Sequence, residues 1–267
     1  MIAPLLVLMA GLVFYPLALT LWGSLHRIVL TRPGTPFVGL TNYVNLFHDS
    51  NVTASWINTL WYLVVAVGVE IVGGFAVALT LHSIRRGQGW LLAAVVLPWA
   101  LPPVVNSIVW GWIYNPSYGL LNGVLYGLHL IPHYQVWFNS RAAALILISL
   151  VHAWRMLPLS AVILLAALKS VPNELYEAAR IDGANGPSAF RWITFPLISG
   201  GLAIALTQAT VFALNIFDEA YVLAGTGLAT RSTLIQVYLS AFQNLHFSYG
   251  MALSFLLMIV ALAVSLF

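Results

Sequence analysis

The stretch at residues 142–168, AAALILISLVHAWRMLPLSAVILLAAL, decides the fold class of this chain. A helix needs about 20 mostly apolar residues to cross the hydrocarbon core of a bilayer. This stretch exceeds that length, and Arg155 is its only formally charged residue. Similar apolar stretches recur along the sequence, which therefore predicts an all-α polytopic membrane protein. The six predicted transmembrane helices are residues 3–25, 58–81, 90–113, 142–168, 199–222 and 248–267.

The composition leads to the same class and excludes others. Of the 267 residues, 61% are hydrophobic and only 6% are charged, too few to give a water-soluble domain a polar surface. The net charge of +3 is spread thinly, with Lys169 as the only lysine, so the sequence lacks the basic patch that nucleic-acid binding needs. Because the chain has no cysteine, thiolate metal sites, cysteine nucleophiles and disulfides are excluded.

The few basic residues predict an orientation in the membrane. Under the positive-inside rule, the short connections that concentrate Lys and Arg face the cytoplasm. These connections hold Arg85, Arg86, Lys169, Arg180 and Arg191, and they leave Arg27, Arg32, Arg141 and Arg231 outside. Both termini of the chain are then expected in the cytoplasm. Since neither end of the sequence carries flanking charges, we expect cytoplasmic tails beyond it.

The connection between spans four and five, KSVPNELYEAARIDGANGP at residues 169–187, is the most hydrophilic part of the chain. Pro172 is expected to end the fourth helix, Asn173 to cap a new helix and Gly183 to end it. The sequence thus predicts a short helix around residues 173–183 on the cytoplasmic face. Its apolar residues available for burial are Leu175, Ala178, Ala179 and Ile181. A charged loop that only satisfies the membrane topology is the alternative interpretation.

The spacing of residues in this connection resembles a known signature. Glu177-Ala178-Ala179, followed by Gly183, Ile193 and Phe195-Pro196, is similar to the EAA motif of ABC importer permeases, except that the family has Leu before the final proline. The run LYEAARIDGA at residues 175–184 resembles the carbohydrate importers in particular. Further matches to sugar permeases of the maltose and glycerol-phosphate type are Gly39-Leu40-Thr41-Asn42-Tyr43, Tyr114-Asn115-Pro116, and Phe217-Asp218 with Tyr221-Val222-Leu223. The last match resembles the first of the two paired permease subunits.

The resemblance implies a fold and a set of partners. The fold would be that of an ABC importer type I permease, a single transmembrane domain over residues 1–267 in a bacterial or archaeal cytoplasmic membrane. A second homologous permease would complete the substrate path, and a dimer of ABC ATPase subunits would supply the energy. An extracytoplasmic substrate-binding protein would dock on segments 28–57, 114–141 and 223–247. The substrate would be a carbohydrate or a polyol phosphate.

The resemblance also implies that the helix around residues 173–183 is the coupling helix, which would sit in a cleft of an ATPase subunit. The implied coupling residues are Glu177, Ala178, Ala179, Arg180, Asp182, Gly183 and Pro196. The sequence contains no G-x-x-x-x-G-K-[ST] phosphate loop, so ATP and Mg²⁺ are expected on the partner ATPase. On this chain we expect no catalytic residue, no bound cofactor and no metal site.

Polar groups inside apolar spans are costly, which makes them candidates for the substrate path. The ionisable groups there are Glu70, Arg155, Asp218 and Glu219. The candidate path residues are Gln208, Phe212, Asn215 and Asp218 in a helical i, i+4, i+7 progression on span five, Trp154 and Arg155 on span four, and Glu70 on span two. The alternative is that such groups join helices to one another, which is favoured for Glu70 because Gly73 and Gly74 follow closely.

An ion-coupled secondary transporter is the main alternative function. Such a transporter is expected to carry inverted repeats and intramembrane charges or broken helices for ion coupling. The two halves of this sequence show no repeat, and its intramembrane charges are few. A membrane-embedded enzyme is the third possibility, but neither H-E-x-x-H nor G-x-S-x-G occurs.

Overall fold

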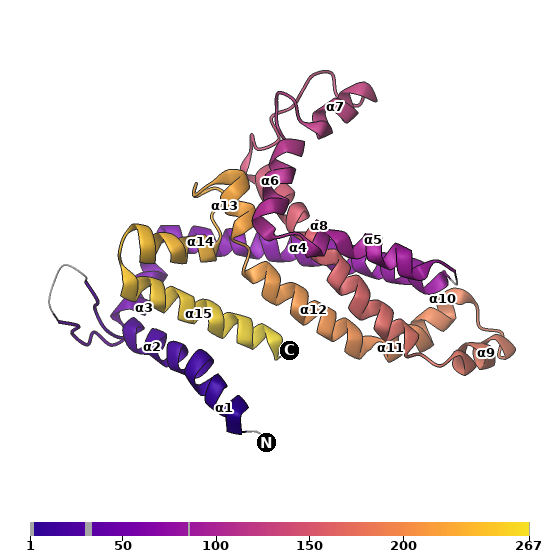
Figure 1. Cartoon of the computed structure of the whole chain (residues 1–267), viewed down its shortest axis with the longest axis horizontal. Coiled ribbons are helices and arrows are strands. Elements are labelled where there is room, and N and C mark those ends of the chain that lie inside the picture. Colours follow the sequence, from indigo (N-terminus) through magenta and orange to yellow (C-terminus); the bar gives the residue numbers. More distant parts are fainter. Residues whose placement is uncertain (1–2, 30–33, 85, 267) are drawn as a thin grey trace. The chain divides into compact units, whose positions relative to one another are not determined.

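A computed structural model of the chain describes residues 3–29, 34–84 and 86–266 (Figure 1). Arg32 and Arg85, which the sequence assigns to opposite sides of the membrane, lie outside the described residues. Within the described ranges the regular structure is helical, apart from one isolated antiparallel bridge between His26 and Phe37. The predicted all-α class is therefore confirmed. It follows from the bilayer itself, because a helix satisfies its own backbone hydrogen bonds where no water is available.

Four helical stretches are long and apolar enough to cross a membrane. They are Ala3–Ser24, which comprises α1 (Ala3–Met9), the π-helical turn η1 (Ala10–Phe14) and α2 (Tyr15–Ser24), then α4 (Ser50–Ser83), α8 (Arg141–Lys169) and α15 (Phe247–Ser265). α4 begins before the predicted residue 58. The reason lies in Asp49, whose Oδ1 accepts a hydrogen bond from the Asn51 N–H at 2.8 Å and so starts the helix in polar sequence.

The predicted span at residues 90–113 is two helices. α5 (Gln88–Ala100) and α6 (Pro103–Ile113) are bent by 93° at the break between them. Pro102 and Pro103 supply no backbone N–H, and a residue before proline is disfavoured in helical geometry, so two consecutive prolines break the helix here.

The predicted span at residues 199–222 also differs in the structure. The short helices α10 (Gly186–Ala189), η2 (Phe190–Thr194) and α11 (Phe195–Leu197) lead into α12 (Ser199–Leu214) with a bend of 67°. α12 ends at Leu214, and α13 (Asp218–Ala224) is a separate helix. Asn215 follows the end of α12, and its Nδ2 donates to the carbonyl of Val211 at 2.7 Å. Counting each bent pair as one span gives up to six spans.

Residues 1–60 and 225–267 make up the first of two compact units. Its helices are α1, η1, α2, α3 (Thr41–His48), the start of α4, α14 (Thr233–Tyr238), η3 (Leu239–Gln243) and α15. α15 packs against α2, α3 and η3. A Cβ added at Gly250 would lie 2.7 Å from the Ala241 Cβ, so the contact between α15 and η3 requires a glycine there.

Residues 61–224 make up the second unit, in which α5 and α12 pack along α8 (Figure 1). Leu164, Leu168, Ile198 and Ala205 belong to its buried apolar core. α7 (Leu120–Gly127) follows α6, and α9 (Asn173–Ile181) follows α8. α4 approaches α8 closely, because a Cβ at Gly74 would lie 3.1 Å from the Ser160 Cβ.

This close approach generates a prediction for two glycines of α4. Gly74→Ile should destabilise the protein by about 1–3 kcal/mol, because the added side chain has no room against α8. Gly68→Ile is the matched control, since a Cβ at Gly68 has no atom within 4 Å. Thermal unfolding in detergent measures both, and equal melting temperatures for the two variants would contradict the packing described here.

Candidate functional site

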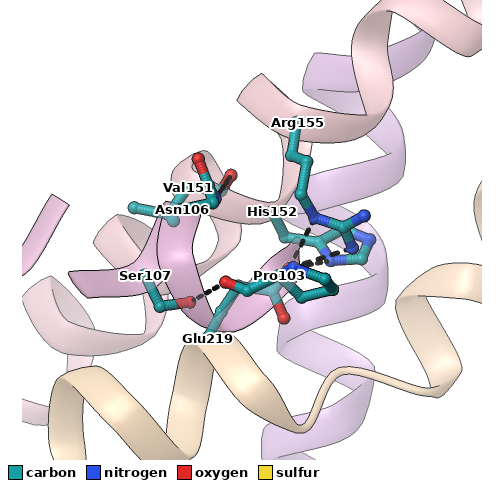
Figure 2. Close-up of polar contacts among 7 residues, drawn as sticks. All are labelled: Pro103, Asn106, Ser107, Val151, His152, Arg155 and Glu219. Atoms are coloured by element: carbon teal, nitrogen blue, oxygen red, sulfur yellow. Dashed lines mark hydrogen bonds and ion pairs between the residues drawn. The ribbon is translucent and has the colours of Figure 1, made fainter. Parts of the chain in front are cut away.

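A charged cluster joins α8 to α13 inside the second unit. His152 and Arg155 lie one turn apart on α8, and both reach the Glu219 carboxylate on α13 (Figure 2). The His152 Nδ1 lies 3.1 Å from Glu219 Oε1, while the Arg155 Nε and Nη2 donate to the same oxygen at 3.3 and 3.2 Å. Because a carboxylate only accepts, the Nδ1 of His152 carries the hydrogen.

Burial makes this cluster a strong constraint on α13. Glu219 and His152 are each only 2% exposed, and the Arg155 guanidinium compensates the buried negative charge. α6 closes the same region with two buried polar residues, Asn106 and Ser107 (Figure 2). The Asn106 Nδ2 donates to the Val151 carbonyl at 3.5 Å, and the Ser107 Oγ donates to the Pro103 carbonyl at 2.7 Å. α13 is short, and the ion pair fixes it against α8.

Arg155 and Glu219 are expected from the sequence as ionisable groups inside spans, but their pairing and the part played by His152 are not. His152 and Arg155 are three residues apart, a spacing that puts both side chains on one face of a helix. That spacing was the available signal. The partner Glu219 lies on a different helix, and no local pattern connects the two.

A second polar cluster joins α4, α8 and α12. The Ser160 Oγ on α8 lies 2.6 Å from Glu70 Oε1 on α4 and 3.3 Å from Gln208 Oε1 on α12. Glu70 is fully buried. Its position beside the close contact at Gly74 agrees with the interpretation that it joins helices.

The remaining candidate path residues are exposed or lie elsewhere than expected. Trp154 is 51% exposed and packs edge-to-face on Trp110 with ring centroids 6.1 Å apart, while Phe212 is 44% exposed. Asn215 is exposed just after the end of α12. Asp218 begins α13, so the expected single helical progression from Gln208 to Asp218 is wrong. Trp154, Phe212 and Asn215 are thus exposed, whereas Glu70 is buried and Gln208, Arg155 and Asp218 are half-buried.

The hydrophilic connection forms the helix α9, which is tied to η2 by a side-chain contact and ends in a glycine turn. The Tyr176 hydroxyl lies 2.9 Å from the Thr194 Oγ1, which ties α9 to η2. Gly183 has φ +78°, and the Ala184 N–H donates to the Ala179 carbonyl at 2.8 Å, the pattern of a glycine-terminated helix end. The expected cap is wrong: Pro172 precedes the first helical residue, Asn173, and no side chain caps the helix.

The coupling residues predicted on α9 are open to contact. Glu177, Ala178, Arg180 and Asp182 are exposed, and Ala179 is half-buried. Of the other apolar residues expected to be buried, Leu175 is exposed, and Ile181 is 87% exposed. Within the described residues, Glu177 and Arg180 form no hydrogen bond through their side chains. Pro196 lies on α11 and is also exposed. α9 therefore presents charged and apolar side chains that are exposed in the described part of the chain.

The cluster at Glu219 generates a stability prediction. Glu219→Ala should lower the free energy of unfolding by about 3–5 kcal/mol. The substitution removes the carboxylate that accepts hydrogen bonds from Arg155 and His152, and it leaves the buried Arg155 charge unpaired. Asp218→Ala is the matched control at the neighbouring acid, which forms no hydrogen bond through its side chain in the described part of the chain. Denaturation in mixed detergent micelles measures both variants, and a similar loss for the two would show that the ion pair does not hold α13.

Comparison with known proteins identifies the family. Residues 70–267 match the family described as binding-protein-dependent transport system inner membrane component. The trehalose/maltose transport system permease protein MalF of Thermococcus litoralis is 36% identical over 264 residues, which cover 98% of this chain and 89% of the relative. The trehalose transport system permease protein SugA of Mycobacterium tuberculosis is 32% identical over 258 residues, 96% of this chain and 82% of the relative.

A solved structure supports the fold. One chain of a bacterial ABC transporter involved in the import of the acidic polysaccharide alginate matches with a TM-score of 0.82 at 19% identity, over 98% of this chain and 90% of that chain. At this identity the likeness concerns the fold alone. From these matches and the apolar helices, the chain belongs to the family of binding-protein-dependent transport system inner membrane components.

Proposed function

We propose that this chain is the membrane-spanning permease subunit of an ATP-driven ABC sugar importer. The observation that carries the proposal is the 36% identity, over 98% of the chain, to a permease described by its transport of trehalose and maltose. The fold shared with the alginate transporter chain is compatible with this proposal. ATP hydrolysis belongs to a separate subunit in such a system.

The proposed topology has six spans in one transmembrane domain over residues 1–267. The bent pairs α5–α6 and α10–α12 each count as one span. The connections at 84–87 and 170–185 then face the cytoplasm together with both termini, and segments 28–57, 114–141 and 223–247 are extracytoplasmic. The distribution of Lys and Arg supports this orientation.

α9 is the proposed coupling helix that meets the ATPase. Its exposed residues support this role, because Ile181 is 87% exposed and Leu175 41% exposed, and the exposed Glu177 is available to pair with a basic residue of the partner. The small Ala178 and Ala179 permit a close approach, and Gly183 makes the turn after the helix. ATP and Mg²⁺ bind the ATPase subunit. Movement of the cleft in that subunit is transmitted through α9 to the transmembrane spans and changes their conformation.

The proposed substrate path lies between this chain and a second, homologous permease. The exposed Trp154 and Phe212 suit the apolar faces of sugar rings, and the exposed Asn215 suits their hydroxyl groups. Between its terminal residues Arg141 and Lys169, α8 carries Arg155 as its one Lys or Arg, and α12 carries none. Glu219 already neutralises Arg155. This favours a neutral carbohydrate over a polyol phosphate as the solute.

The test of the proposed function is reconstitution. We expect purification from native membranes to recover a second permease and a P-loop ATPase with this chain, and proteoliposomes holding the complex to take up sugar only with ATP and the binding protein. Uptake by this chain alone, driven by an ion gradient without ATP, would instead establish the secondary transporter.

Variants on α9 test coupling. Glu177→Lys should abolish uptake and substrate-stimulated ATPase activity while leaving membrane insertion intact, because it places a positive charge against the basic residue proposed on the partner. Gly183→Leu should do the same, since a side chain at φ +78° strains the turn. Glu174→Lys, the same exchange on the same helix but outside the proposed coupling residues, is the control. Full coupled transport by both Glu177→Lys and Gly183→Leu would contradict the assignment.

A further inference from the structure

Two adjoining pockets in the first unit form one polar groove. The larger has a volume of about 670 Å³ and the smaller about 320 Å³, and they share Asn45, His246 and Tyr249. The larger pocket is lined by residues of two stretches, 45–51 and 226–249. The smaller one adds residues from 27–42. Nothing in the proposed coupling or path residues uses this groove.

Two charged residues that line the groove, Asp49 and Arg231, form hydrogen bonds with other residues of the same unit. The Tyr249 hydroxyl donates to Asp49 Oδ2 at 2.7 Å, which joins α15 to the end of α3. Arg231 donates through Nε and Nη2 to the Thr226 carbonyl at 3.0 and 2.7 Å, and through Nη1 to Gln236 Oε1 at 2.9 Å. These bonds make the groove a built feature of the fold.

Other polar side chains that line the groove are available for hydrogen bonds with a partner. Asn45, Gln243, Asn244 and His246 are exposed, and within the described residues their side chains have no hydrogen-bond partner. Arg27, in the smaller pocket, is exposed and forms no ion pair with any described residue. The groove therefore offers free amide and imidazole groups beside one uncompensated positive charge.

The backbone at the edge of the groove is strained. Leu245, between Asn244 and His246, has φ +57°, a region that costs a branched apolar residue energy, and its side chain is 51% exposed. The neighbours hold it there, because the N–H groups of Asn244 and His246 donate to the carbonyls of Leu239 and Ser240, both at 2.8 Å. Strained residues kept in place by their surroundings concentrate at functional sites such as ligand clamps and switch regions.

The chemistry of the lining favours a polypeptide over a free sugar. Tyr249 is the only Phe, Tyr or Trp among the lining residues, so the groove offers one half-buried aromatic ring on which a sugar could stack. A peptide segment, in contrast, offers main-chain groups for the amides, a carboxylate for Arg27 and an apolar side chain for Leu245.

We propose that this polar groove receives an acidic, protruding segment of the extracytoplasmic substrate-binding protein. A carboxylate of that segment pairs with Arg27, its polar groups bind Asn45, Asn244 and His246, and an apolar side chain packs on Leu245. The inference rests on the proposed function, which makes segments 28–57 and 223–247 extracytoplasmic and supplies the partner. It adds the site and the charge of the segment that docks.

The test uses the complete importer in lipid nanodiscs and its purified binding protein, with affinity measured by biolayer interferometry. Arg27→Glu and Asn244→Asp should each weaken binding by about tenfold at low ionic strength, with a smaller loss at high salt where charges are screened. Arg27→Lys should bind like the wild type because it keeps the charge. Arg86→Glu, the same reversal at an exposed arginine outside the groove, is the matched control and should leave the affinity unchanged.

A photo-crosslinking amino acid at Asn244 identifies what enters the groove. A crosslink that mass spectrometry maps to an acidic segment of the binding protein supports the proposal. Unchanged affinity of Arg27→Glu, or a crosslink only to a neutral segment, overturns it. Reduced uptake with unchanged affinity for the binding protein also overturns it, because the groove would then contact the sugar. In all these cases the wild-type complex still binds the binding protein, whereas a wild-type complex that fails to do so contradicts the proposed function itself.

Discussion

The rest of the structure depends on one constraint: a backbone inside lipid must satisfy its own hydrogen bonds. The constraint dictates helices, and it makes every break in a helix costly. In the second unit the breaks coincide with buried polar side chains. α6, which begins at Pro103, carries the buried Asn106 and Ser107, and α13, which starts after the end of α12, carries Glu219. Polar contacts thus hold the pieces that the helix breaks create.

The scarcity of acidic residues makes their positions informative. The seven acids are Asp49, Glu70, Glu174, Glu177, Asp182, Asp218 and Glu219. Glu70 and Glu219 are buried and join helices, Asp49 builds the wall of the polar groove, and the three acids on or just after α9 are exposed. Buried acids therefore organise the apolar body, whereas the acids on or just after α9 are exposed, as the proposed contact with a partner subunit requires.

Sequence predicted the helical class because uninterrupted apolar length is a local property, and the ends of α8 and α15 lie within a residue or two of those expected. It also predicted a short helix ending near Gly183, where the turn needs a glycine. It failed where the outcome depends on contacts between distant residues. His152, Arg155 and Glu219 meet only after α8 and α13 pack. The apolar composition of residues 199–222 predicted one span that includes Asp218, although the helix ends at Leu214.

In the proposed importer an ATPase subunit drives this permease through α9. A photo-crosslinking amino acid at Ile181, whose side chain is 87% exposed on that helix, tests this coupling in the assembled importer. We expect a crosslink to the ATPase subunit whose yield changes when ATP is bound. A crosslink formed only to lipid, or one to the ATPase that stays the same in every nucleotide state, would contradict it.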